Sequence, residues 1–130
     1  MTVTQADSPL EVYQFHILLL KISPAIWRRI LVRSDSSVAD FHYILQIVMG
    51  WEDIHLHQFV LHGKTYGIAQ VGGISFSEDP SQLKLSDGHL RVRERFEYQY
   101  DFGDNWLHQI RLEQVLPFNP AKTSPFVFKG

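Results

Sequence analysis

The stretch YQYDFGDNWLHQIRLE, from Tyr98 to Glu113, alternates apolar and polar residues on both sides of a short polar turn. Alternation with a period of two is typical of a strand with one buried face. The turn centres on Gly103-Asp104-Asn105. Glycine and asparagine tolerate left-handed backbone there, and aspartate can accept hydrogen bonds from the turn amides. The stretch therefore predicts an antiparallel hairpin.

A second hairpin is predicted near the start of the chain. Residues 13–20 read YQFHILLL and residues 26–33 read IWRRILVR, and both runs favour strands. Ser23-Pro24-Ala25 interrupts them, because proline presets a turn and has no backbone N–H to donate. Two strands joined by so short a connection must run antiparallel.

The segment between these hairpins predicts one helix. Ser37 and Asp40 have the spacing of a capping box, and Gly50 is placed to end the helix. The apolar positions recur at helical spacing and form one stripe, which we expect to lie on the sheet: Phe41, Ile44, Leu45 and Val48. A further hairpin is predicted after the helix, with its loop at Gly63-Lys64.

These elements predict the α+β class. The expected architecture is a largely antiparallel or mixed sheet, built from hairpin, helix, hairpin and later hairpin, with one main helix packed on it. The order of hairpin, helix and strand resembles the start of a β-grasp fold. We expect a disordered leader over residues 1–10, a single α+β domain over residues 11–116 and an irregular tail over residues 117–130.

Composition excludes several classes of function. The 130 residues, 45% of them hydrophobic, are enough for one core. The chain has no cysteine, which excludes disulfides, thiolate zinc sites and cysteine nucleophiles. The formal net charge of -2 gives no global attraction to nucleic acid or an anionic membrane. The first residues lack a signal-peptide pattern, and no apolar run could span a bilayer, so we expect a soluble, cytoplasmic protein without a membrane partner.

Three stretches in order, ISPAIWRRILV (22–32), HLHQFVLHGKTYG (55–67) and YQYDFGDNWLHQIRLE (98–113), resemble the plasmid pRiA4b ORF-3-like family. The resemblance implies an α+β domain of unassigned biochemical function, often associated with plasmids or insertion elements. Family members typically continue into a Pro-Pro-Glu-Asp and Gly-Gly segment and a C-terminal helix. This chain stops at Gly130 and so resembles a shortened or truncated member. The third stretch carries the family motif: Tyr100, Asp101, Phe102, Gly103, Asp104, Trp106 and His108.

The histidines are the candidate metal ligands. His55 and His57, two residues apart on a predicted strand, would share one face and could reach one divalent metal ion. His108, Asp101 or Asp104 could supply a third ligand. However, His57 and His108 each lie in register with apolar neighbours, which favours hydrogen-bonded histidines at the edge of the core. We prefer this structural interpretation. We therefore predict no specific cofactor, and a divalent metal ion is the alternative.

The arginines are the candidate contacts for nucleic acid or a protein partner. Arg28, Arg29 and Arg33 lie on the first hairpin, with aromatic residues nearby that could stack on bases. A second basic run precedes the last hairpin and consists of Arg91, Arg93 and Arg95. It shares a strand face with Glu97, whose negative charge would cancel much of the positive field of these arginines.

No catalytic residue is predicted. Asp101, Asp104 and His108 could exchange protons, but carboxylates in a turn usually stay solvated and bond to backbone amides. We therefore expect a non-enzymatic binding or interaction module, linked to mobile elements, with an unknown protein partner. A metal-dependent enzyme that uses a His55, His57 and His108 cluster is the first alternative, and a nucleic-acid-binding module is the second. The enzyme requires ligands that converge on the histidines, whereas the module requires an exposed apolar or basic patch.

Overall fold

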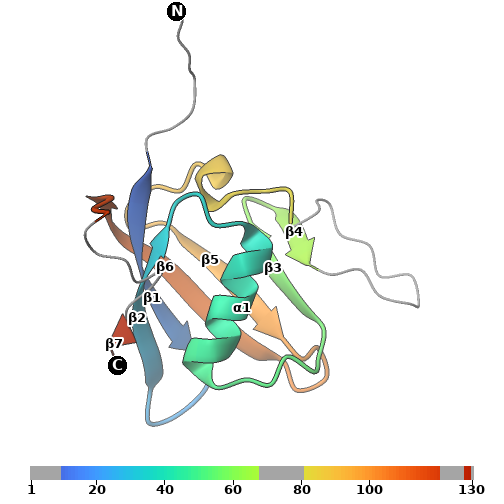
Figure 1. The fold of residues 1–130 in the computed structure, drawn as a ribbon. Coiled ribbons are helices and arrows are strands. Elements are labelled where there is room, and N and C mark those ends of the chain that lie inside the picture. Colours follow the sequence, from blue (N-terminus) through green and yellow to red (C-terminus); the bar gives the residue numbers. More distant parts are fainter. Residues whose placement is uncertain (1–9, 68–80, 121–127, 130) are drawn as a thin grey trace, which may run out of the picture.

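A computed structural model describes residues 10–67, 81–120 and 128–129 of the chain (Figure 1). Its helices are α1 (Val38–Met49) and a short 3-10 helix, η1 (Leu85–Gly88). Its strands are β1 (Glu11–Leu19), β2 (Ile26–Arg33), β3 (His57–Leu61), β4 (Lys64–Gly67), β5 (Arg95–Tyr100), β6 (Trp106–Pro117) and β7 (Phe128–Lys129). They form one sheet in the order β4-β3-β5-β6-β1-β2-β7, and every neighbouring pair is antiparallel.

The predicted α+β class is wrong, because the described chain is predominantly β. A seven-stranded sheet carries one α-helix of 12 residues, since only the segment around residues 37–50 has a helical period. The resemblance to a β-grasp start is wrong for a separate reason. β1 lies between β2 and β6 and runs antiparallel to both, whereas a β-grasp fold pairs its first strand with a late strand in parallel. Neither helix of the described residues is long and apolar enough to cross a membrane.

The core lies between α1 and the sheet face that it crosses in Figure 1. Phe41 of α1 is its centre: its ring stacks on Phe59 at 5.6 Å and lies 5.0 Å from Phe15. Side chains that point away from α1 are half-buried or exposed, because no helix of the described residues covers that face. The side chains under α1 are fully or almost fully buried: Phe15, Ile17, Phe59, Tyr98, Ile110 and Leu112.

The predicted ends of the helix are confirmed. The Asp40 amide donates to Ser37 Oγ at 2.9 Å, and the Gly50 amide donates to carbonyls of the last turn. The turns differ in detail from the prediction. The β3–β4 loop is His62-Gly63, one residue earlier than expected. In the β5–β6 turn the left-handed residues are Asp101 and Asn105, whose side chains accept local hydrogen bonds, and Gly103 is not left-handed.

Gly50→Ala is expected to lower the free energy of unfolding by about 1 kcal/mol, because Gly50 has φ of 79° and an L side chain is strained there. A Cβ at Gly50 would meet no atom within 4 Å, so the effect would come from the backbone alone. Gly103→Ala is the control and should change stability by less than about 0.5 kcal/mol. Urea denaturation of both variants measures the difference, and equal losses would contradict the expectation.

Candidate functional site

A closed ring of hydrogen bonds joins α1 to the sheet. The Tyr98 hydroxyl donates to His42 Nδ1 at 2.6 Å, and His42 Nε2 donates to Asp53 Oδ1 at 2.7 Å. The Asp53 amide donates to Gln46 Oε1 at 2.7 Å, and Gln46 Nε2 donates to the Tyr98 hydroxyl at 2.8 Å. Because the Asp53 carboxylate can only accept a hydrogen bond, the proton of the neutral His42 ring lies on Nε2. Every group of the ring is thus satisfied with His42 neutral, and burial lowers the pKa of His42.

His57 stacks directly on His42. The two imidazole centroids are 3.5 Å apart and the rings are almost parallel, at 7°. His57 is 2% exposed, and neither of its ring nitrogens has a hydrogen bond within the described part of the chain. Burial, and then the neighbouring His42, lower the pKa of His57 to about 3. His57 is therefore a neutral imidazole held by packing.

His108 has both ring nitrogens engaged. Nδ1 donates to the Tyr98 carbonyl at 3.0 Å, and Nε2 accepts from Trp51 Nε1 at 3.0 Å. Because the indole is a donor only, this pairing holds His108 in one neutral tautomer. Burial lowers the pKa of His108 to about 4. The role of His108 in these contacts is to fix the position of Trp51.

The structure separates the three histidines that the sequence groups as metal ligands. β3 begins only at His57, so the prediction of one strand that carries both His55 and His57 is wrong. His55 lies in the preceding loop, where its side chain is 45% exposed and its Nε2 is 3.4 Å from Asp101 Oδ2. In residues 10–67, 81–120 and 128–129, no three histidines or carboxylates are arranged to hold a metal ion.

The three arginines of β2 already have partners. Arg28 donates to the Val48 carbonyl at 3.0 Å, which satisfies the last turn of α1, and to the Trp27 carbonyl at 2.8 Å. The other two each bind one carboxylate through two hydrogen bonds: Arg29 with Glu113 (2.6 and 2.9 Å) and Arg33 with Asp35 (3.0 and 2.8 Å). Arg29 lowers the pKa of Glu113 to about 2. The trio does not form one free basic patch.

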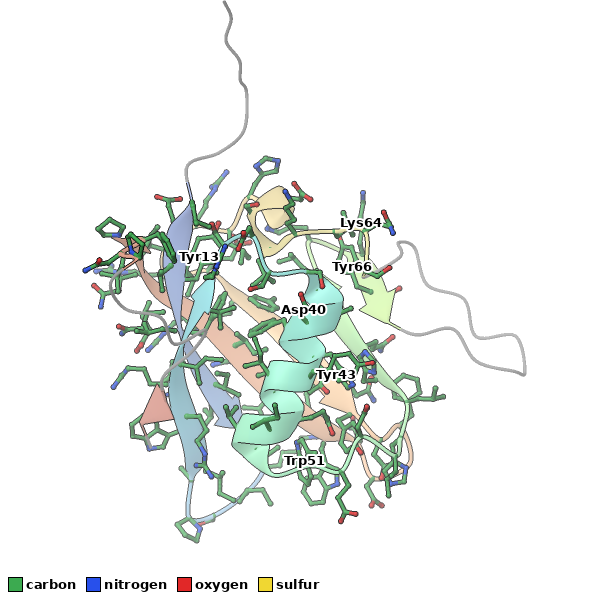
Figure 2. All side chains as sticks on the ribbon, viewed as in Figure 1. Tyr13, Asp40, Tyr43, Trp51, Lys64 and Tyr66 are labelled. Atoms are coloured by element: carbon green, nitrogen blue, oxygen red, sulfur yellow. The ribbon has the colours of Figure 1, made fainter. Side chains whose placement is uncertain are left out.

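Four residues of the family motif meet the loop after α1 around a surface hollow. It lies beyond the C-terminal end of α1, where Figure 2 shows Trp51, and its volume is about 280 Å³. We name it the aromatic–acidic hollow. Its lining combines aromatic, acidic and loop residues: Gly50, Trp51, Glu52, Ile54, His55, Tyr100, Asp101, Asp104 and Trp106.

The aromatic rings of this hollow are held in place from beneath. The Trp51 ring lies 5.4 Å from Trp106 and 5.5 Å from Tyr100, at tilts of 31° and 32°. His108 holds the Trp51 indole N–H, and the Tyr100 hydroxyl accepts from the Ile54 amide at 2.9 Å. The family motif thus supplies two of the rings, Tyr100 and Trp106, and the buried histidine that orients the third, Trp51.

The rim of the hollow is negatively charged. Asp101 Oδ1 accepts from the Gly103 and Asp104 amides at 3.1 and 3.2 Å, so Asp101 fixes the turn. The exposed side chains of Glu52 and Asp104 make no hydrogen bond or ion pair with any described residue. Carboxylates beside aromatic faces attract cations through both Coulomb and cation–π interactions.

The sequence analysis named His55 and the four motif residues of the hollow, but it did not connect Glu52 and Ile54 with them. Trp51 and Glu52 are separated from Trp106 by about fifty residues, and only the antiparallel pairing of β3 with β5 brings these segments together. The available signal was the run WEDIH directly after the helix-ending glycine. It places an aromatic and two acidic residues in a loop, where binding residues are common.

Two comparisons identify similar proteins of undefined activity. The chain is 33% identical to a crystal structure titled protein of unknown function MM3350, from Methanosarcina mazei Go1, with a TM-score of 0.78 over 95% of this chain and 70% of that one. It is 28% identical over 107 residues to the uncharacterized protein y4hQ of Sinorhizobium fredii (strain NBRC 101917 / NGR234). That match covers 82% of this chain, which spans 55% of the relative's length.

The family model described as plasmid pRiA4b ORF-3-like protein matches residues 11–130. The match includes all three stretches on which the sequence resemblance depends, and that resemblance is confirmed. The chain belongs to the plasmid pRiA4b ORF-3-like family.

Proposed function

We propose that this domain is a non-enzymatic binding module, and that the aromatic–acidic hollow binds a lysine or arginine side chain of a protein partner. The observation that carries the proposal is the rim of carboxylates beside the half-buried rings of Trp51 and Trp106. A cation next to an aromatic face gains about 0.5–1 kcal/mol at an exposed site and more when it is desolvated. Glu52 and Asp104, which have no partner among the described residues, add attraction to a cation.

The internal use of the buried titratable groups supports binding rather than catalysis. Both ring nitrogens of His42 and of His108 form hydrogen bonds within the fold. A general acid or base needs a proton position that faces the substrate. Asp101, the most buried acid of the hollow rim, is occupied by the turn amides. The link to mobile elements and the cytoplasmic location stay predictions.

A peptide titration tests the proposal. The probe is a short peptide with alternating glycine and lysine or arginine, and the readout is the tryptophan fluorescence of the protein. We expect saturable binding, weakened about tenfold in Glu52→Gln/Asp104→Asn, because each exposed ion pair contributes up to about 1 kcal/mol. Both substitutions keep the shape of the side chain, and neither carboxylate makes a hydrogen bond or ion pair with a described residue.

The matched control is Glu11→Gln/Glu97→Gln, which changes the net charge equally but lies on β1 and β5 outside the hollow. Its affinity for the basic peptide should stay within about twofold of the wild type, because neither residue lines the hollow and salt weakens the field of charges outside it. Equal loss in both variants, or equal binding of a peptide with glutamine in place of each basic residue, would refute a specific cation site.

A further inference from the structure

A row of basic residues crosses the sheet face that points away from α1. Arg95 of β5 lies directly opposite Arg111 of β6, Arg111 lies opposite His16 of β1, and His16 lies opposite Arg29 of β2. We name these four residues the arginine row. Direct cross-strand neighbours have side chains on the same face, and like charges in that position destabilise a sheet. The directly opposite Arg95 and Arg111 are therefore a pair that folding alone does not favour.

The positive charges of the row are only partly neutralised. Arg95 is exposed and has no ion pair with a described residue. Arg111 reaches Glu113 only at 3.7 Å, and the same carboxylate is already bound by Arg29 at 2.6 Å. Glu97, two residues from Arg95 on the same face, is the other acid beside the row. Three guanidinium groups thus face two carboxylates.

Two more arginines lie in the segment directly before β5. The Arg93 amide donates to the Leu112 carbonyl at 2.7 Å, which places Arg93 beside the strand that carries Arg111. Arg91 and Arg93 are exposed and line a shallow hollow with His62, His89, Val92 and Glu94. Glu94 is engaged by His62 and by the Arg91 amide. Arg91 and Arg93 thus add two exposed guanidinium groups in the segment directly before Arg95.

The other end of the row lies on an aromatic pair. The His16 imidazole stacks on the Trp27 indole at 5.3 Å and 19°, and the Arg29 guanidinium lies 5.4 Å from the same indole. Both rings are half-buried on the sheet face away from α1. Burial lowers the pKa of His16, so this imidazole is a neutral stacking surface at pH 7.

We infer that this sheet face binds an extended single-stranded nucleic acid, with phosphates along the arginine row and a base against the His16–Trp27 pair. Guanidinium groups match phosphate oxygens through paired hydrogen bonds. Neighbouring strands lie about 4.8 Å apart, so the row presents a line of donors to an extended polyanion. Aromatic platforms on a sheet stack unpaired bases, which a duplex does not offer. This face lies opposite to α1, so the inference goes beyond the cation-binding hollow. Of the six arginines that the sequence analysis named, Arg29 and Arg95 belong to the row.

Fluorescence anisotropy with a labelled single-stranded 12-mer, as DNA and as RNA, tests the inference. Arg95→Gln/Arg111→Gln should weaken binding at least about tenfold and reduce the slope of log K against log salt by about 1.4, the value for two lost phosphate contacts on a single strand. The matched control Lys64→Gln/Lys84→Gln removes the same charge near the β3–β4 loop and η1. It should stay within about twofold of the wild type.

Trp27→Leu separates stacking from charge. It should weaken binding about fivefold with an unchanged salt slope, because stacking on one aromatic ring contributes about 1–3 kcal/mol per base. Circular dichroism confirms that each variant is folded. Two further probes decide the class of ligand: equal affinity for the matching duplex, or for a polyglutamate peptide, overturns the assignment to single strands. Unchanged affinity and slope in Arg95→Gln/Arg111→Gln overturn the arginine row as the site.

Discussion

Tyr98→Phe is expected to lower the free energy of unfolding by about 2–4 kcal/mol, although it removes a single oxygen atom. Tyr98 is fully buried, and its hydroxyl both donates to His42 Nδ1 and accepts from Gln46 Nε2. Without that oxygen two buried polar groups lose their partners at once, and each unsatisfied group costs about 1–3 kcal/mol. Burial also raises the pKa of Tyr98, which keeps its hydroxyl proton available for donation.

Tyr66→Phe is the matched control for Tyr98→Phe. Tyr66 lies beside Lys64 on the β3–β4 hairpin, as Figure 2 shows, and its hydroxyl has no hydrogen bond with a described residue. Its effect should be within about 0.5 kcal/mol, as for most surface substitutions. Urea denaturation at pH 7 measures both variants. If the two losses were equal, the ring of hydrogen bonds would not stabilise the fold.

Local signals in the sequence predicted the ends of the helix. Ser37, Asp40 and Gly50 act within a few residues of one another, so their spacing is enough to identify the caps. The predicted fold class was wrong because the class depends on which distant strands pair in the sheet. β6 extends over 12 residues and takes the free side of β1, a choice made by contacts about one hundred residues apart. Alternation of apolar and polar residues predicts where strands lie in the sequence, but not which strands pair with each other.

The two buried polar residues of α1 in the ring of hydrogen bonds had a weak sequence signal, because they alternate with the apolar stripe of the helix. His42 and Gln46 are four residues apart on α1, next to Phe41 and Leu45, and both are buried. Polar residues at that spacing share a helix face and need partners if that face is covered. Their partners, Tyr98 and Asp53, come from other segments, so only the packed structure shows that the groups satisfy one another.

Acidification from pH 7 to pH 4.5 is expected to lower the free energy of unfolding by several kcal/mol, chiefly through His57 and His108. Their folded pKa values of about 3 and about 4 lie below the unfolded value near 6.5. Both states are neutral above pH 6.5, so the full stability is present there. Between pH 6.5 and 4 the unfolded chain binds protons that the folded chain excludes, and stability is lost as the pH falls. At pH 4.5 each histidine accounts for about 2–3 kcal/mol of that loss.

His57→Gln and His57→Phe isolate one of these two groups. Each variant lacks the titrating imidazole, so its loss of stability between pH 7 and pH 4.5 should be smaller than that of the wild type by about 2–3 kcal/mol. Because each protein is compared with itself at two pH values, any packing defect present at both pH values cancels. His89→Gln, which removes an exposed histidine, should keep the full wild-type loss. Wild-type behaviour in both His57 variants would mean that this imidazole takes up its proton in the folded state, and would contradict its burial against His42.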